Sequence, residues 1–434
     1  MSFPRYPAYK PSGVEWLGEV PEHWYTKPLW SLFRRTKRQG YEEEELLSVY
    51  RDHGVIPKSS RDDNFNKPSD DLSAYQLVEP GDLTVNKMKA WQGSVAISNY
   101  RGIVSPAYHV YSPLHSENSR FLHYLMRCDR YTAAYLSLSK GIRVNQWDLQ
   151  PEYHSRMAIL LPPMEEQATI ATFLDHETTK IDALIAEQQR LIELLQEKRQ
   201  AVISQAVTKG LNPGAPMKDS GVEWLGEVPE HWTVCSFRRF TRIAEGQVDP
   251  RVEPYAEMPL IAPNHIEART GLLTYLETAQ EQGAESGKYL CNAGDVIYSK
   301  IRPALRKACI APHDCLTSAD MYPLKTSQCL SPDFLLFFLL SEEFSALAVL
   351  ESERVAMPKV NRDTLGAVPM AFPPRGEQAD ICRHITEVTN GIDELTNEAA
   401  SSVHLLQERR SALISAAVTG QIDVRGLVPE ASAG

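Results

Sequence analysis

Apolar side chains recur with the spacing of a long amphipathic helix in two stretches of the chain. After Ile170, they occupy the a and d positions of a heptad repeat, interrupted by polar Glu177, Gln188 and Lys198. These apolar positions are Leu174, Ile181, Leu184, Leu191, Leu195 and Val202. The second stretch keeps the spacing at Ile385, Val388, Ile392, Leu395, Ala399, Leu406 and Leu413. The pattern predicts two helices of about 44 residues, each roughly 66 Å long.

The residues that flank these stretches agree with two helices. Each stretch begins directly after a Pro-Pro pair, which favours a helix start, and each ends near a glycine, Gly210 or Gly420. A helix of this length with one apolar seam needs a partner, and the other copy is the simplest one. We therefore predict an antiparallel coiled coil; a separate helical hairpin in each half is the alternative. The predicted pairing residues are Ile181, Leu184, Leu191, Leu195, Val202, Ile392, Leu395, Leu406 and Leu413.

The chain also contains an internal repeat. Residues 10–24 read KPSGVEWLGEVPEHW and residues 218–232 read KDSGVEWLGEVPEHW, so 14 of 15 positions match at an offset of 208. Three later pairs match at an offset of 211: PPMEEQ with PPRGEQ, LQEKR with LQERR, and Val207-Thr208 with Val418-Thr419. The chain therefore consists of two halves, each a globular segment followed by a long helix.

Between the matching ends, the two globular segments diverge and only a sparse frame recurs. Its members are Gly81-Asp82-Leu83 with Asn86-Lys87, beside Gly294-Asp295-Val296 with Ser299-Lys300, and Val144-Asn145 beside Val360-Asn361. One scaffold thus carries two different surfaces. A rigid helical pair holding two unlike domains suits the reading of two short DNA half-sites at a fixed spacing.

Composition excludes several classes of protein. The longest apolar run, Phe334 to Leu340, is far shorter than a membrane helix, and the N-terminus lacks the apolar core of a signal peptide, so we expect a cytoplasmic protein. The seven cysteines are scattered without a CxxC pair, which favours buried free thiols and no metal site. The net charge of −11 argues weakly against a nucleic-acid partner, but what matters is whether cations gather locally.

Basic side chains do gather, at the same place in both halves. They follow a predicted strand at residues 82–85 in the first half and at residues 295–298 in the second, and a further group follows the first repeated segment. Such loops can meet phosphates and base edges, although an exposed charged loop is the simpler interpretation. The candidates are Arg34, Arg35, Lys37, Lys87, Lys89, Gln92, Lys300, Arg302, Arg306 and Lys307, with Arg38 and Trp91 beside them.

Two residues late in each globular segment are weaker candidates for DNA contact. They are Asn145, Gln146, Asn361 and Arg362, and turn formation or helix capping explains them slightly better. The duplicated tryptophans cannot distinguish two different sequences, because they are the same in both halves. We expect them in the core or at a partner contact: Trp16, Trp24, Trp224 and Trp232.

A search for catalytic motifs finds none. The segment GAESGK at residues 283–288 has one residue too few for a phosphate-binding P-loop, and Tyr289 stands where Ser or Thr belongs. GxGxxG, GxSxG and HExxH motifs and the Pro-Pro-aromatic motif of amino-methyltransferases do not occur. His23 and His231 lie in the duplicated frame, so a catalytic role would need two identical sites. We expect a protein without catalytic activity, metal or cofactor of its own.

The duplicated GVEWLGEVPEHW segments, and PPxxEQ leading into a helix that ends LQE(K/R)R…AVT, resemble the specificity subunits of type I restriction-modification systems. The resemblance covers residues 11–420. It implies a mixed α/β fold with target-recognition domains at 1–160 and 211–372, spacer helices within 161–210 and 373–420, and a tail at 421–434.

The same resemblance implies partners. Each domain would read half of a bipartite, asymmetric DNA site, and the helices would dock two methyltransferase subunits, which flip and methylate adenine. Restriction subunits with motor and nuclease activity would join for cleavage. S-adenosylmethionine, ATP and Mg²⁺ would be bound by the partners. Alternatives from other classes are an assembly scaffold that binds only protein, and a nuclease with duplicated catalytic domains.

Overall fold

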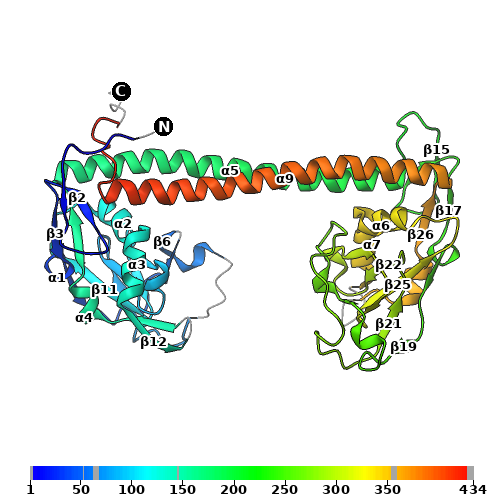
Figure 1. Cartoon of the computed structure of the whole chain (residues 1–434), viewed down its shortest axis with the longest axis horizontal. Coiled ribbons are helices and arrows are strands. Elements are labelled where there is room, and N and C mark those ends of the chain that lie inside the picture. Colours follow the sequence, from blue (N-terminus) through cyan, green and yellow to red (C-terminus); the bar gives the residue numbers. More distant parts are fainter. Residues whose placement is uncertain (1–2, 52, 62–67, 144–145, 353–358, 428–434) are drawn as a thin grey trace. The chain divides into compact units, whose positions relative to one another are not determined.

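The computed structural model describes residues 3–51, 53–61, 68–143, 146–352 and 359–427. The chain divides into two compact units (Figure 1): unit 1 comprises residues 1–187 and 402–434, and unit 2 comprises residues 188–401. Both long helices take part in both units, because each is continuous across the division. They are α5, Met164–Lys209, and α9, Arg375–Val418. None of the helices in the described ranges has the length and apolar character needed to span a membrane.

Each unit is built around an antiparallel four-stranded sheet with the same strand order. In unit 1 the order is β4 (Phe33–Thr36), β11 (Tyr108–Pro113), β8 (Leu83–Asn86) and β9 (Val95–Ile97). In unit 2 it is β18 (Thr241–Ile243), β25 (Met321–Thr326), β22 (Val296–Ser299) and β23 (Ala308–Ile310). This duplicated sheet confirms the mixed α/β fold.

Short helices cover each sheet. In unit 1, α2 (Ser119–Arg127) packs on β9 and α3 (Asp129–Leu138) packs on the 3₁₀ turn η2 (Ala90–Gln92). In unit 2, α6 (Pro332–Leu340) packs on β22 and β23, and α7 (Glu342–Ser352) packs on the turn η6 (Pro303–Leu305) (Figure 1). The corresponding elements occupy corresponding places, so the internal repeat extends through the divergent interiors.

Other strands and helices of each unit lie outside this sheet. In unit 1 they are β1 (Tyr9–Pro11), β2 (Glu19–Pro21), β3 (Tyr25–Pro28), α1 (Leu29–Leu32), β5 (Leu47–Tyr50), β6 (Gly54–Pro57), β7 (Gln76–Val78), β10 (Gly102–Val104), β12 (Ser139–Arg143), β13 (Gln146–Leu149), α4 (Pro151–Ser155) and β14 (Ala158–Leu161). In unit 2 they are β15 (Met217–Asp219), β16 (Glu227–Pro229), β17 (Thr233–Ser236), η3 (Phe237–Arg239), β19 (Gln247–Val248), β20 (Leu260–Ile261), β21 (Lys288–Cys291), β24 (Cys315–Thr317), α8 (Arg362–Ala367) and β26 (Pro369–Phe372).

The Gly-Asp pairs of the repeated frame form the turns that lead into β8 and β22. Gly81 and Gly294 have φ of +90° and +85°, a conformation that glycine adopts without strain. The Asp82 carboxylate accepts from the backbone N–H of Glu79, and Asp295 accepts from that of Asn292, each at 2.9 Å. Sequence patterning placed these strands one residue too early.

One predicted match in the frame needs correction. The backbone N–H of Leu149 donates to the Lys87 carbonyl at 3.0 Å, and that of Val360 donates to the Lys300 carbonyl at 2.9 Å. Leu149, not Val144, is therefore the counterpart of Val360. The predicted counterpart fails because local sequence similarity does not determine which backbone groups pair; Val144 and Asn145 themselves lie outside the described residues.

A carboxylate in the first turn of each long helix holds it to the repeated VPEHW segment. Glu166 accepts a hydrogen bond from Trp24 Nε1 at 3.1 Å, and its second oxygen lies 2.7 Å from His23 Nε2. Glu377 repeats both contacts, with Trp232 and His231, at the same two distances. Trp24 and Trp232 are buried in the cores of their units, as expected of residues shared by both halves.

The glutamine next to each of these carboxylates makes the second attachment. The Gln167 side chain donates to the Pro162 carbonyl and accepts from the backbone N–H of Asn118, which caps α2. Gln378 donates to the Pro373 carbonyl and accepts from the backbone N–H of Ser331, which precedes α6. The EQ of the PPxxEQ motif thus fixes each long helix to its own domain.

The long helices pair antiparallel inside each unit. In unit 1, Arg410 of α9 forms an ion pair with Asp182 of α5 at 2.8 Å; in unit 2, Arg199 of α5 forms one with Asp393 of α9 at 2.9 Å. The two aspartates are 211 positions apart (393 − 182), and so are the two arginines (410 − 199). One contact is therefore made twice, with the roles of the two helices exchanged.

The apolar seam differs from the predicted one at three positions. Leu184, Leu191 and Leu395 are 47%, 42% and 53% exposed, whereas their neighbours Ile192 and Thr396 are half-buried. The other predicted pairing residues are buried or half-buried: Ile181, Leu195, Val202, Ile392, Leu406 and Leu413. At Leu184 and Leu191 the next residue, Ile185 or Ile192, is also apolar, so either phase fits the sequence and packing selects one. At Leu395 the more buried neighbour is the polar Thr396.

The C-terminal segment also belongs to the fold. Val424 is fully buried in the core of unit 1, and the backbone N–H of Asp423 donates to the Pro4 carbonyl at 2.8 Å. Tyr6 donates to Glu166 at 2.6 Å, and Arg425 lies 4.9 Å from the centre of the Tyr6 ring, so the segment after α9 packs on a residue that binds this carboxylate. The sequence carries no signal for this contact.

The seam assignment predicts different effects for two adjacent leucines of unit 2. Leu195→Ala should lower the free energy of unfolding by about 2–4 kcal/mol, because the Leu195 side chain is 9% exposed. Leu194→Ala should change it by no more than about 0.5 kcal/mol, because that side chain is 44% exposed. Urea unfolding monitored by hydrogen exchange of α5 measures both, and equal effects would contradict this seam.

Candidate nucleic-acid interface

The predicted contact residues correspond most clearly in the turns that follow β8 and β22. In unit 1, the Asn86 N–H donates to Ser94 and the Gln92 N–H to Lys89; in unit 2, the Ser299 N–H donates to Lys307 and the Leu305 N–H to Arg302. Because the same backbone bonds close both turns, positions 86–94 correspond to 299–307 at an offset of 213. Lys87 therefore matches Lys300, and Lys89 matches Arg302.

Lys89 and Arg302 occupy the same structural position. Each is the residue that precedes its 3₁₀ turn, η2 or η6, and each is exposed. Neither side chain is engaged with another described residue. Two cations at matched places in domains with otherwise different interiors form the best candidate for contact with the phosphates that every duplex presents.

Three other basic residues of the unit 2 turn have their head groups engaged inside the protein. Lys300 donates to the Ala319 carbonyl at 2.6 Å and lies over the Tyr322 ring, and Lys307 donates to the Pro263 carbonyl at 2.6 Å. Arg306 donates to Gln200 of α5 at 2.7 Å, and burial lowers its pKa. The three side chains were predicted to contact DNA. In the structure, their head groups bind acceptors within the protein and hold the turn in place.

Arg306 also shows how the unit 2 turn is attached to the long helix. Its backbone carbonyl accepts from Arg269, whose own carbonyl accepts from Arg199 and Gln200 of α5. The matched position in unit 1 is Gly93. The position of the unit 2 turn therefore depends on α5 in a way that has no counterpart at Gly93.

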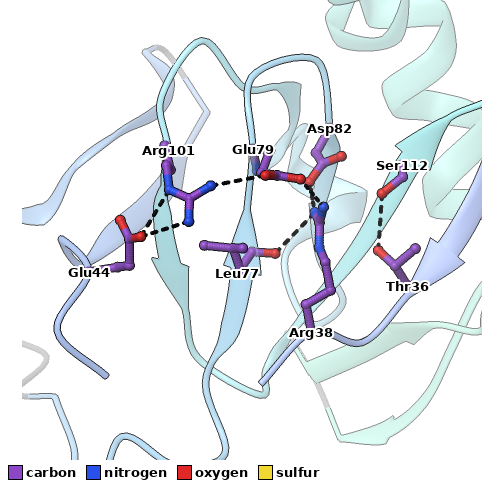
Figure 2. A network of polar contacts seen from close by, with 8 residues as sticks. All are labelled: Thr36, Arg38, Glu44, Leu77, Glu79, Asp82, Arg101 and Ser112. Carbon is purple, nitrogen blue, oxygen red and sulfur yellow. Dashed lines mark hydrogen bonds and ion pairs between the residues drawn. The ribbon is translucent and has the colours of Figure 1, made fainter. Parts of the chain in front are cut away.

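The basic run after α1 divides between surface and interior. Arg34, Arg35 and Lys37 are exposed, whereas Arg38 forms ion pairs with Glu79 and the buried Asp82 and donates to the Leu77 carbonyl (Figure 2). Glu79 also receives Arg101, so this group of charges is largely neutralised. Only the first three residues of the run remain available to a ligand.

Arg35 lies beside a buried histidine. Its guanidinium is 3.2 Å from His109 Nδ1, and Lys87 adds to the positive potential there. Burial first, and then these two cations, lower the pKa of His109 to about 4. His109 is therefore neutral at physiological pH and does not add to the cationic surface.

Strand pairing reveals two cations, Arg242 and Lys325, that the sequence motifs did not indicate. Arg34 is paired with Ser112 in the β4–β11 ladder, and Arg242 is paired with Lys325 at the matched position of β18–β25. Arg242 and Lys325 are exposed, and neither forms an ion pair with the residues the structure describes. The offset of 208 that relates the first repeated segments also relates Arg34 to Arg242, so the repeat contained the signal.

The candidates near the end of each globular segment divide into two groups. Asn361 and Arg362 have partners within the protein, whereas Asn145 lies outside the described residues. The Asn361 side chain accepts from the Thr364 N–H at 2.8 Å and caps α8. Arg362 donates to the Ala244 carbonyl at 3.0 Å and stacks on Tyr289 and Tyr322. Asn145 lies outside the described residues, and Gln146 begins β13. A capping role for Asn361 was the alternative that the sequence favoured.

A groove of about 1020 Å³ lies in unit 1 between the α2–α3 region and the two long helices. Two of its arginines form ion pairs, Arg120 with Asp175 and Arg410 with Asp182, and Arg127 donates a hydrogen bond to His123. Gln92 also lines it. No cluster of metal-binding side chains is found among the residues that the structure describes.

The duplicated sheets, the matched turns and the paired helices define a protein with two similar domains, each fixed to a long helix. Residues 21–195 and 230–404 both match the family model described as the type I restriction modification DNA specificity domain. The chain belongs to this family and contains its domain twice.

Known relatives and structures agree with this membership. The chain is 28% identical over 281 residues to the type I restriction enzyme EcoDI specificity subunit of Escherichia coli, covering 61% of this chain and 62% of that relative. It is 21% identical to the putative type I restriction enzyme MjaX specificity subunit of Methanocaldococcus jannaschii, covering 94% of this chain and 96% of that one. A solved structure from a study of type I R-M complex assembly superposes with a TM-score of 0.66 at 16% identity, covering 92% of this chain and 98% of that one, and shows the shared fold.

The buried histidines of unit 1 predict a pH dependence of stability. Burial lowers the pKa of His123 to about 4 and of His154 to about 3, as it does for His109. Their folded pKa values lie below the unfolded value near 6.5, so the unfolded state binds more protons between these limits. The stability that they provide is complete above about pH 6.5 and is lost as pH falls through about 4.

Calorimetry at pH 5 in buffers of different ionisation enthalpy measures this proton uptake. His123→Gln should reduce the uptake on unfolding by nearly one proton, because the buried His123 is neutral in the folded protein at this pH. Equal uptake by the wild type and His123→Gln would show that His123 is already protonated in the folded protein.

Proposed function

We propose that this chain is the DNA sequence-recognition subunit of a type I restriction-modification complex, with each domain reading one half of a bipartite, asymmetric site. The observation that carries this proposal is that one sheet is built twice. In each copy, the turn after β8 or β22 presents an exposed cation at the same position, Lys89 in unit 1 and Arg302 in unit 2. The residues around these cations differ between the two copies. Family membership supports the assignment and a non-catalytic role.

The proposed division of labour follows the repeat. Residues 1–160 and 211–372 form the recognition domains, residues 161–210 and 373–420 supply the spacer helices that set half-site distance, and residues 421–434 form the tail. The Glu166 and Glu377 contacts support this division, because they fix each helix to its own domain. The burial of Val424 supports assigning the first part of the tail to the first domain's core.

Two methyltransferase subunits and the restriction subunits are the proposed partners, and the protein would act in the cytoplasm, where the DNA is. Exposed leucines recur on the helices at an offset of 211: Leu184 with Leu395, and Leu194 with Leu405, all at least 44% exposed. Matched apolar positions suit two copies of one partner. S-adenosylmethionine, ATP and Mg²⁺ would belong to those partners.

The central test measures binding of the full-length chain, assembled with its methyltransferase partner, to DNA. Sequencing of methylated adenines in cells that express both identifies the site, and a duplex carrying it should bind much more tightly than a scrambled duplex. The logarithm of affinity should fall linearly with the logarithm of salt concentration. Equal affinity for both duplexes would contradict sequence recognition.

Exchange of one domain interior tests the assignment of half-sites. Replacing residues 28–160 by the corresponding segment of a relative with a different specificity should change only one half of the methylated site, because the frame that attaches the domain is retained. The matched control replaces residues 236–371 and should change only the other half. A change in both halves after either exchange would refute the separation.

A further inference from the structure

The two 3₁₀ turns carry one matched exposed position and one unmatched exposed position. Lys89 and Arg302 precede η2 and η6, and both are cations. Three residues later, Gln92 is exposed in unit 1, and Leu305, at the same place in unit 2, is 40% exposed. The backbone bonds that close the turns are the same. The backbone conformation of the matched cation differs, because Lys89 has φ of −127° and Arg302 has φ of +48°.

A residue type shared by two domains that read different half-sites cannot discriminate between those half-sites. It can serve only what the half-sites have in common, which is the phosphate backbone. Conversely, an exposed residue beside it that differs between the domains can contribute to discrimination. Gln pairs in a bidentate manner with adenine in the major groove, whereas an apolar side chain contacts the thymine methyl group.

We infer that each turn divides its work between two positions: Lys89 and Arg302 contact phosphates without regard to sequence, while Gln92 and Leu305 discriminate one base pair in their respective half-sites. Gln92 favours adenine and Leu305 favours thymine. This inference rests on the proposed function, because it assumes that both domains engage a duplex.

The surrounding contacts support the assignment of the cations. In unit 2, Lys300, Arg306 and Lys307 have their head groups committed to Ala319, Gln200 and Pro263, so Arg302 is the basic residue of this turn that remains available. The engaged residues hold the turn, and Arg306 ties it to α5. Arg302 is thereby presented on a fixed backbone.

The unmatched residues are close enough to act on the same duplex segment. Gln92 donates its backbone N–H to the Lys89 carbonyl, and Leu305 donates to the Arg302 carbonyl at 2.9 Å, so each pair spans a single turn of 3₁₀ helix. The two residues of each pair are therefore presented by one short turn. The indole of Trp91 is fixed by a hydrogen bond to the Met88 carbonyl at 3.1 Å, which restricts the unit 1 turn further.

The test uses the full-length chain assembled with its methyltransferase partner, and duplexes with the mapped or a scrambled site. Lys89→Ala and Arg302→Ala should each weaken binding to both duplexes by the same factor. Each should reduce the slope of log affinity against log salt concentration by about 0.9, the value for one phosphate contact. Arg251→Ala is the control: it removes an exposed arginine that Asp249 neutralises at 2.8 Å, and the slope should stay unchanged.

Gln92→Leu and Leu305→Gln test the discriminating positions. Each should alter binding roughly 10-fold to 100-fold at one base pair of one half-site, measured with single-substitution duplexes, and should leave the scrambled duplex unaffected. The half-site altered by Gln92→Leu should be the one that changes on exchange of residues 28–160.

The outcomes separate the inference from the proposed function. If the wild-type complex does not distinguish the two duplexes, the proposed function fails. If it does, but Lys89→Ala affects only the specific duplex or leaves the salt slope unchanged, the phosphate assignment is overturned. If Gln92→Leu weakens both duplexes equally, or affects neither, the discriminating role is overturned.

Discussion

The arrangement of each unit depends on a carboxylate in the first turn of a long helix. Glu166 and Glu377 each bind the indole N–H of a buried tryptophan and the imidazole of the preceding histidine. Losing a partner of a buried polar group costs about 1–3 kcal/mol, so these contacts resist separation of helix from domain. A domain that reads DNA at a set distance needs this attachment, because any movement between domain and helix would change the spacing of the half-sites.

The repeat separates what the two domains share from what makes them different. Shared residues form the attachment, the turns into β8 and β22, and the cations that precede η2 and η6. Unshared residues include the third turn positions and the anchoring of the unit 2 turn through Arg306. A duplicated scaffold with independent surfaces allows one half-site to change while the other is retained, and the structure places Gln92 and Leu305 on turns, where substitution disturbs the sheet least.

Several features were predictable from sequence because they depend on local periodicity or on exact repetition. The bounds of α5 and α9 follow from the heptad pattern, the Pro-Pro pairs and the terminal glycines. The phase of the seam was not predictable at Leu184 and Leu191, because each is followed by another apolar residue. It was not predictable at Leu395 because the polar Thr396 is the more buried of the two. The hydrogen bonds that engage the head groups of Lys300, Arg306 and Lys307 were likewise not predictable from the sequence, because their acceptors are distant in the chain.

The sequence by itself determined the duplication, the two long helices and the family, because these depend on repeated sequence segments and on the regular heptad spacing of apolar residues. The tertiary structure decided which cations remain exposed, which face of each helix is buried and where the segment after α9 packs. The physical reason is that exposure and hydrogen-bond partners are properties of surfaces that distant segments form together. A basic run has the same letters whether its charge meets a carboxylate, as at Arg38, or solvent, as at Arg34.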